Sequence, residues 1–202
     1  MVLGRKDVVL SGEGWMEDEL CGRTFRISPQ SFYQVNAQQA EVLYRAAIDL
    51  AGLTGHETLL DAYCGTGTIG LCASDRIDRL IGVELNSDAV RDAKENARRN
   101  GVENVGFICD DAGRFMTRMA KDGVAPDVVL MDPPRAGSDE PFLRSLISLA
   151  PERVVYVSCD PRTQARDLLL LTRGGYRCER AVPVDMFPGT EHIECVVALT
   201  RA

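Results

Sequence analysis

Short apolar runs alternate with amphipathic stretches along the chain from about residue 55 onward. Most of the runs are apolar at consecutive positions and rich in Val and Ile, as is typical of strands covered on both faces. This alternation predicts an α/β fold with a doubly wound, mostly parallel sheet. The predicted strands are Thr58–Ala62, Leu80–Leu85, Val105–Cys109, Asp127–Met131, Val154–Ser158 and Cys195–Leu199.

Helical spacing of apolar residues is clearest in two stretches. Residues Ala37–Ala51 place an apolar stripe on one face, which predicts a helix. Ser87–Arg99 is predicted as a second helix, with Ser87 as its N-cap and Gly101 as its C-terminal stop. Near the C-terminus, Tyr176–Asp185 and Ile193–Thr200 are predicted as strands joined by a short turn, so we expect an antiparallel pair at the edge of the sheet.

The first 35 residues differ from the rest of the chain. Val8–Leu10 and Leu20–Ile27 are predicted as short β segments, with a turn at Ser11–Gly14. Thirty-five residues are too few to form a core of their own. We therefore expect a β-rich N-terminal extension over 1–35 and one main domain over 36–202.

Composition and charge narrow the class of protein. The 202 residues are 45% hydrophobic and 26% charged, which is ordinary for a globular protein and suggests one domain with an extension. The apolar runs fall far short of the roughly 18 residues of a membrane span, so no membrane partner is expected. The net charge of 23 − 30 = −7 argues against strong non-specific binding of nucleic acid by this chain alone.

Seven cysteines are present, and they form no C-x-x-C pair. A zinc or iron–sulfur site is therefore not expected. The N-terminus is polar and lacks the apolar core of a signal peptide. Reduced thiols in the cytoplasm are the natural expectation.

A glycine-rich segment follows the first strand of the main domain. Gly65, Gly67 and Gly70 form G-x-G-x-x-G, and Glu84 ends the next strand 19 residues beyond the first glycine. Such glycines let a ligand approach the backbone, and a carboxylate at that offset accepts hydrogen bonds from ribose hydroxyls. NAD and S-adenosylmethionine both fit, while Asp61, four residues before Gly65, favours S-adenosylmethionine. A tight turn without any ligand is the alternative.

Asp132-Pro133-Pro134-Arg135 follows the fourth predicted strand. The prolines end the strand and stiffen the loop at the carboxyl edge of the sheet, where ligands bind. We expect Asp132 to contact cofactor or substrate; a rigid turn with a capping aspartate is the alternative.

Cys159 lies at the carboxyl end of the fifth predicted strand, at the same edge as the glycine loop. A helix starts nearby, with Thr163 and Arg166 in its first turns, and such surroundings lower a thiol pKa. Cys159 is therefore the best candidate nucleophile, with Cys64 second. A buried cysteine without chemistry is the alternative.

Two carboxylates and a histidine precede the final strand, at Glu191, His192 and Glu194. A carboxylate here could act as a base near the cysteine nucleophile. A solvated charged turn is the alternative.

Taken in order, these segments resemble the RNA uracil-C5 methyltransferase family, which modifies uridines in ribosomal and transfer RNA. The matching segments are Phe25–Pro29, Ser31–Asn36, Asp61–Gly67, Gly82–Glu84, Asp132–Arg135, Val157–Pro161 and His192–Glu194. The resemblance implies a Rossmann-like class I methyltransferase fold over 36–202, S-adenosylmethionine as cofactor and RNA as substrate. It also implies that 1–35 is the remnant of a central domain.

The resemblance assigns roles to residues. Gln34, Tyr63, Glu84 and Asp132 match cofactor-binding positions, together with the loop glycines Gly65 and Gly67. Thr68 matches another cofactor position, where relatives often have Asn. Cys159 matches the nucleophile, and Glu194 rather than Glu191 matches the base, because the family pattern is His-x-Glu before the last strand.

The chain departs from the family pattern in lacking an N-terminal RNA-binding β-barrel, and it has no iron–sulfur ligands of the kind some relatives carry. We therefore expect a C-terminal excerpt of a longer protein, with a naturally short homologue as the alternative, and ribosomal RNA favoured over transfer RNA as the substrate. A methyltransferase acting on another base or a small molecule, and a non-catalytic module with the same fold, remain as alternatives.

Overall fold

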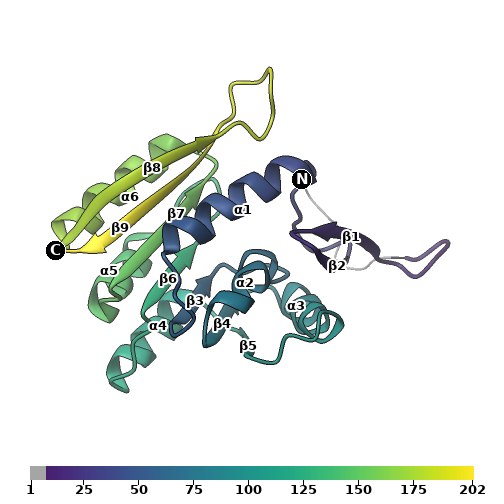
Figure 1. Ribbon diagram of the computed structural model, residues 1–202, viewed down its shortest axis with the longest axis horizontal. Coiled ribbons are helices and arrows are strands. Elements are labelled where there is room, and N and C mark those ends of the chain that lie inside the picture. Colours follow the sequence, from purple (N-terminus) through teal and green to yellow (C-terminus); the bar gives the residue numbers. More distant parts are fainter. Residues whose placement is uncertain (1–7) are drawn as a thin grey trace.

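The computed structural model describes residues 8–202. Within them, a seven-stranded sheet has the strand order β5-β4-β3-β6-β7-β9-β8, and a separate two-stranded sheet pairs β1 with β2 (Figure 1). The strands are β1 (Met16–Leu20), β2 (Arg23–Ile27), β3 (Thr58–Ala62), β4 (Arg79–Glu84), β5 (Val105–Cys109), β6 (Val128–Met131), β7 (Arg153–Ser158), β8 (Tyr176–Val184) and β9 (Glu194–Arg201). The α-helices are α1 (Ala37–Ala51), α2 (Thr68–Ala73), α3 (Ser87–Arg99), α4 (Ala112–Lys121), α5 (Glu140–Leu149) and α6 (Pro161–Arg173), and a short 3₁₀ helix covers Ser74–Arg76.

Both faces of the large sheet are covered by helices. Successive strand residues alternate between two cores: Leu59 and Leu130 pack with α1, α2 and α3, whereas Leu60 and Met131 pack with α4 and α5 (Figure 1). This is the reason for the continuous apolar runs, because each strand buries both of its faces.

The chain reverses its direction of travel across the sheet between β3 and β6. From β3 it moves outward to β4 and β5, and from β6 it moves the opposite way to β7. β3 pairs in parallel with both β4 and β6, so the loops that follow β3 and β6 leave the sheet side by side. Such a switch point is where doubly wound folds bind ligands.

The expected fold class is confirmed, including the antiparallel C-terminal pair: β8 and β9 are antiparallel to each other, and β9 is antiparallel to β7. The helices Ala37–Ala51 and Ser87–Arg99 and the strands Thr58–Ala62 and Val105–Cys109 have the predicted bounds. The other predicted strands of the large sheet are present with ends shifted by one or two residues.

Three local predictions are wrong. Val8–Leu10 is exposed and forms no strand, because nothing covers its apolar side chains. The expected segment Leu20–Ile27 contains a turn at Cys21 and Gly22, both at positive φ, and is therefore divided between two strands. The N-cap of α3 is Asn86 rather than Ser87, since its side chain accepts a hydrogen bond from the Asp88 amide.

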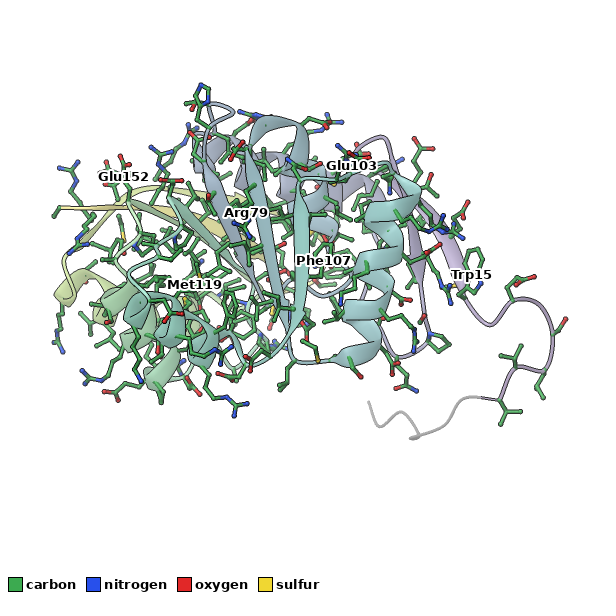
Figure 2. The ribbon with its side chains drawn as sticks, turned by 90° about the horizontal axis from the view of Figure 1, so that it is seen from below. Trp15, Arg79, Glu103, Phe107, Met119 and Glu152 are labelled. Atoms are coloured by element: carbon green, nitrogen blue, oxygen red, sulfur yellow. The ribbon has the colours of Figure 1, made fainter. Side chains whose placement is uncertain are left out.

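The β1–β2 hairpin lies beside α3 (Figure 1) and shares the main core. Leu20 and Phe25 are fully buried in the cluster formed by α1, α2 and the sheet. On the outer side, Trp15 lies under the guanidinium groups of Arg26 and Arg99, at 5.2 and 4.6 Å from its ring centre (Figure 2). The hairpin therefore depends on the main domain for its burial, as the short length of the segment predicts.

In residues 8–202, none of the helices has the length and apolar character needed to cross a membrane.

Candidate active site

The glycine loop connects β3 to α2 and has positive φ at Tyr63, Gly65 and Gly67. Gly67 has φ +82°, and a Cβ there would lie 2.8 Å from Phe107 Cζ on β5 (Figure 2), so no larger residue fits. Gly65 has φ +54°, and a Cβ there would meet no atom within 4 Å. The loop therefore packs against the sheet at Gly67 and presents open space beside Gly65, as a cofactor cradle requires.

Glu84 ends β4 and faces the glycine loop. Its Oε2 accepts a hydrogen bond from the Gly65 amide at 3.2 Å, and its Oε1 accepts one from the Asn86 amide at 2.7 Å. The side chain is partly exposed. A carboxylate oxygen accepts more than one hydrogen bond, so both oxygens can also accept from ribose hydroxyls.

Asp61 is buried under the same loop and stabilises its far end. Its Oδ2 accepts a hydrogen bond from the Gly70 amide at 3.0 Å, and a Cβ on Gly70 would lie 2.8 Å from that oxygen. Burial raises the pKa of Asp61 to about 7, and the charge of Glu84 adds to this effect. Asp61 therefore orients the first turn of α2 rather than facing the cradle.

Two of the predicted cofactor residues, Thr68 and Tyr63, contact neighbouring helices. Thr68 is buried, and its hydroxyl lies 3.2 Å from the hydroxyl of Tyr44 on α1. Tyr63 has φ +64°; its hydroxyl donates to Ser138 Oγ at 3.4 Å, and its ring packs on Phe142 of α5 at 4.9 Å between centroids.

Gln34 lies in the segment between β2 and α1 and is 8% exposed. Asn36, which caps α1, donates from Nδ2 to the Met186 carbonyl at 3.0 Å, so this segment is attached to the β8–β9 connection. In Figure 1 that connection projects beyond the sheet next to α1.

Asp132 follows β6 and lies across the switch point from the glycine loop. Burial, together with the nearby charges of Glu194 and Asp61, raises the pKa of Asp132 to about 8. A carboxylate under such repulsion is stabilised by a cation, and the sulfonium of S-adenosylmethionine is a cation.

Helix α6 holds the loop that follows Asp132. Thr163 Oγ1 donates to the Arg135 carbonyl at 3.2 Å, and Asp167 Oδ2 accepts from the Ser138 amide at 2.9 Å. Gly137 has φ +75°, and a Cβ there would lie 2.7 Å from both Arg166 Nη2 and Asp167 Oδ2. The backbone of this loop is therefore fixed, while the Arg135 side chain is free to extend into solvent.

Cys159 lies between β7 and α6 and is partly buried. The pKa of its thiol is raised, first by burial and then by the charges of Glu194 and Asp132, while Arg135 lowers it. The expected lowering of this pKa is therefore wrong, because burial and two carboxylates together outweigh one guanidinium. Arg166, which was expected to help, instead donates to Asp167 and to the Ala136 carbonyl.

Glu194 opens β9 and is brought beside Cys159 by strand pairing. Ser158 on β7 lies opposite Cys195 on β9, so the next position along this antiparallel pair brings Glu194 beside Cys159. Glu194 is 6% exposed, and burial raises its pKa, whereas Glu191 is exposed in the preceding loop.

Arg135 and His192 are exposed at the solvent side of the cluster formed by Asp132, Cys159 and Glu194. Arg135 Nη2 lies 3.4 Å from His192 Nδ1, and Arg135 Nε lies 4.0 Å from Asp160 Oδ2. Arg135 is 66% exposed, which leaves the guanidinium available to an anionic partner.

The sequence analysis did not single out Tyr44, Asn96 or Asp167, which hold the loops of this site. Asp167 is 1% exposed and also accepts from Tyr156 Oη at 2.7 Å. Only one signal was available: Asp92, Asn96 and Asn100 recur every four residues on α3, a spacing that puts polar groups on one helix face.

Comparison with solved structures defines the class of protein first. The chain is similar to the Pyrococcus abyssi tRNA (uracil-54, C5)-methyltransferase in complex with S-adenosyl-L-homocysteine, with a TM-score of 0.80 and 32% identity over 98% of this chain and 49% of that one. A SAM-dependent methyltransferase from Agrobacterium tumefaciens has the same fold, with a TM-score of 0.71 and 17% identity over 94% of this chain and 71% of that one. The fold is therefore that of S-adenosylmethionine-dependent methyltransferases.

Sequence comparison identifies the family. A protein of Lactiplantibacillus plantarum named as an uncharacterized RNA methyltransferase is 48% identical over 100% of this chain and 44% of its own length. One of Oceanobacillus iheyensis with the same description is 45% identical over 99% of this chain and 44% of its own length. The profile described as tRNA (Uracil-5-)-methyltransferase matches residues 16–202, and the chain belongs to this family. It spans less than half the length of the curated relatives it matches.

The comparisons confirm the family suggested by the sequence, and S-adenosylmethionine as its cofactor. The residues present fit this cofactor: open space adjoins Gly65, the Glu84 carboxylate lies next to it, and Asp132 lies across the switch point.

Proposed function

We propose that the protein transfers a methyl group from S-adenosylmethionine to C5 of a uridine in RNA, by way of a covalent bond between Cys159 and C6 of the uracil. One observation carries this proposal: the β7–β9 pairing brings Glu194 beside Cys159, and both residues lie close enough to Asp132 at the switch point that Glu194 raises the pKa of Asp132 and Asp132 raises the pKa of Cys159. A thiol and a carboxylate converging on the donor site are what methylation at uracil C5 requires.

The chemistry follows from the weak nucleophilicity of uracil C5. Addition of the Cys159 thiolate to C6 breaks the C5–C6 double bond and moves its electron pair toward C5 and the O4 carbonyl. C5 then takes the methyl group, which S-adenosylmethionine supplies when bound. Glu194 removes the remaining C5 proton, and the electron pair of that C–H bond re-forms the double bond as the Cys159 sulfur leaves.

The ionisation of the site supports the same division of roles. A raised pKa lets Glu194 hold a proton once it has accepted it. Cys159 has to lose its proton first, and the guanidinium of Arg135 favours the thiolate. A bound cation next to Asp132 would add to that effect.

Cofactor binding in this proposal involves both sides of the switch point. The glycine loop, with Gly65 and Gly67, approaches the donor through its backbone, and Glu84 accepts from the ribose. Asp132 provides a negative charge. Gln34, Tyr63 and Thr68 complete the cradle, with Thr68 held by Tyr44 and Tyr63 held by Ser138.

RNA binding by these 202 residues is expected to be weak and salt-sensitive. The net charge of −7 opposes non-specific binding to the phosphates of RNA. We interpret residues 1–35 as an extension of the catalytic domain and place most of the RNA affinity of the whole protein outside this chain. All seven cysteines are free thiols, which supports a reducing compartment such as the cytoplasm.

The experiment that tests the proposal is covalent trapping. The chain is incubated with S-adenosylmethionine and RNA containing 5-fluorouridine, which has no C5 proton to release, at low salt. A stable protein–RNA band on a denaturing gel, mapped to the peptide of Cys159, is expected. Methyl transfer to RNA without a trapped adduct would favour another base as the target, and cofactor binding without any transfer would favour a non-catalytic module.

The RNA itself is identified by a second assay. Ribosomal and transfer RNA transcripts are offered separately, and 5-methyluridine is mapped by mass spectrometry. We expect ribosomal RNA to be the better substrate; preferential methylation of tRNA, the substrate of the Pyrococcus abyssi relative, would reverse that choice and leave the chemistry unchanged.

A further inference from the structure

Helix α3 carries two asparagines whose side chains bind the backbone of β2. Asn96 Oδ1 accepts from the Arg26 amide at 2.7 Å, and its Nδ2 donates to the Arg26 carbonyl at 3.2 Å. Asn100 binds Thr24 in the same way, with distances of 3.0 and 2.8 Å. The side-chain amides thus bind alternate residues of β2 through both backbone groups.

The spacing of helix and strand explains this arrangement. Four residues of α-helix rise about 6 Å, and two residues of strand advance about 6.7 Å. Side chains four apart on α3 therefore meet residues two apart on β2. Each asparagine carboxamide takes the place of a peptide group, so α3 satisfies the strand edge as another strand would.

Asp92 extends the row to the segment that leads to Gln34. Its carboxylate accepts from the Ser28 amide at 3.0 Å, from Ser28 Oγ at 2.8 Å and from Ser31 Oγ at 2.9 Å. Asp92 is 1% exposed, so these bonds are shielded from water.

Asn96 differs from the other two residues in reaching the glycine loop. Its Nδ2 also donates to the carbonyl of Thr66 at 3.1 Å. Thr66 lies between Gly65 and Gly67, and both Thr66 and Asn96 are almost completely buried. One carboxamide therefore joins β2 to the loop that approaches the methyl donor.

We propose that Asn96 is a positioning residue for the methyl donor: it sets the glycine loop against the β2 segment that leads to Gln34. The inference rests on the proposed function, since it takes the glycine loop and Gln34 as parts of the donor site. Without Asn96 Nδ2, the Thr66 carbonyl loses a buried hydrogen bond, and the glycines on either side let the loop move.

Asn100 provides a matched control, because it makes the same pair of bonds to β2, while its further bond goes to the Asn96 carbonyl within α3 rather than to the glycine loop. Asn96→Ala and Asn100→Ala are compared by urea unfolding and by calorimetric titration with S-adenosylhomocysteine. Both variants are expected to unfold at lower urea. Asn96→Ala is expected to bind about five-fold or more weakly than the unchanged protein, and Asn100→Ala within about two-fold.

A second measurement separates positioning from loss of stability. Amide hydrogen exchange at Gly67, which donates to the Cys64 carbonyl at 2.8 Å, reports on the glycine loop directly. It is expected to speed up in Asn96→Ala and not in Asn100→Ala. Should Asn96→Ala fail to fold, Asn96→Ser, which keeps a donor of shorter reach, undergoes the same measurements.

If Asn96→Ala and Asn100→Ala bound S-adenosylhomocysteine with the same affinity, whether weakened or not, the proposal would be overturned. The polar side chains of α3 would then serve only to hold the β1–β2 hairpin. If the protein without any substitution did not bind S-adenosylhomocysteine, that result would instead contradict the proposed function. The two failures are therefore distinguishable.

Discussion

The two sides of the switch point are built differently. On the side of β3 and β4, one loop of consecutive residues forms the cradle, and its geometry is fixed by backbone amides that donate to Asp61 and Glu84. On the side of β6, β7 and β9, the reacting groups come from three connections: Asp132 follows β6, Cys159 follows β7, and Glu194 opens β9.

The electrostatics differ as well. Glu84 is partly exposed and already accepts two backbone amides, so its charge is well solvated. Burial raises the pKa values of Asp132, Cys159 and Glu194, and neighbouring carboxylates raise those of Asp132 and Cys159 as well. In the proposed mechanism, the first side binds the donor, whereas the second becomes active when a cation arrives or a proton is transferred.

Replacing the nucleophile tests the reacting side most severely. Cys159→Ala is expected to abolish methylation and the 5-fluorouridine adduct, because the proposed addition to C6 requires its thiolate. Affinity for S-adenosylhomocysteine is expected to stay within about two-fold, since Cys159 is not one of the proposed donor contacts. Cys195→Ala, a substitution in the neighbouring strand, is the control and should keep both activities; residual methylation by Cys159→Ala would show that the two sides are not divided in this way.

Removing the base should separate the steps of the reaction. Glu194→Gln leaves addition and methyl transfer possible but removes the acceptor for the C5 proton, so turnover should fall by about 100-fold or more. A methylated protein–RNA adduct should accumulate on a denaturing gel. Glu191→Gln changes an exposed carboxylate and should have a mild effect. Trapping by Glu191→Gln with normal turnover of Glu194→Gln would reverse the assignment.

The cradle is tested at Glu84. Glu84→Ala should weaken donor binding by about 1.5–3 kcal/mol, or roughly 10- to 150-fold, because a charged acceptor is lost. Calorimetry with S-adenosylmethionine measures this, and Glu103→Ala, at an exposed carboxylate beyond α3, is the control. Unchanged affinity would remove Glu84 from the site.

The two sides should communicate through the charge of the donor. S-adenosylmethionine and S-adenosylhomocysteine differ by a methyl group and a positive charge, and a cation near Asp132 lowers the pKa of Cys159. Iodoacetamide should alkylate Cys159 about ten-fold faster with the charged cofactor, since one pKa unit changes the thiolate fraction about ten-fold. Peptide mass mapping reads the rate, with exposed Cys178 as internal reference; equal rates with both cofactors would contradict the coupling.

The smallest expected effect concerns stability and pH. Asp61 binds its proton more tightly in the folded protein, with a pKa of about 7 against the usual 3.8, so stability is lost as the pH rises through about 7. Between about pH 6 and about pH 8, the free energy of unfolding should fall, and by about 1 kcal/mol less in Asp61→Asn, which keeps an acceptor for Gly70 and cannot ionise. Urea unfolding at each pH measures the free energy of unfolding of both proteins. If this free energy fell equally with pH in the two, Asp61 would not be the group responsible.

The difference between local signals and contacts with distant segments also explains how much of the fold could be predicted from the sequence. The strands Thr58–Ala62 and Val105–Cys109 have the predicted bounds because their apolar runs are local signals. The predictions were wrong in the N-terminal segment. Val8–Leu10 is apolar but exposed, and the turn at Cys21 lies within an otherwise strand-like stretch. Hydrophobic pattern reports burial only where the fold supplies a partner surface.

The sequence alone determined the class of fold, the glycine loop with Glu84 at its offset, and the strand-end positions of Asp132 and Cys159. These are local features, because spacing along one strand–loop–helix unit sets them. Only the tertiary structure decided that Glu194 and not Glu191 lies beside Cys159, that repulsion raises the pKa of the thiol, and that Asn96 joins β2 to the glycine loop. Those facts depend on which distant segments pack together and on how much water they exclude, and neither is encoded in the spacing of neighbouring residues.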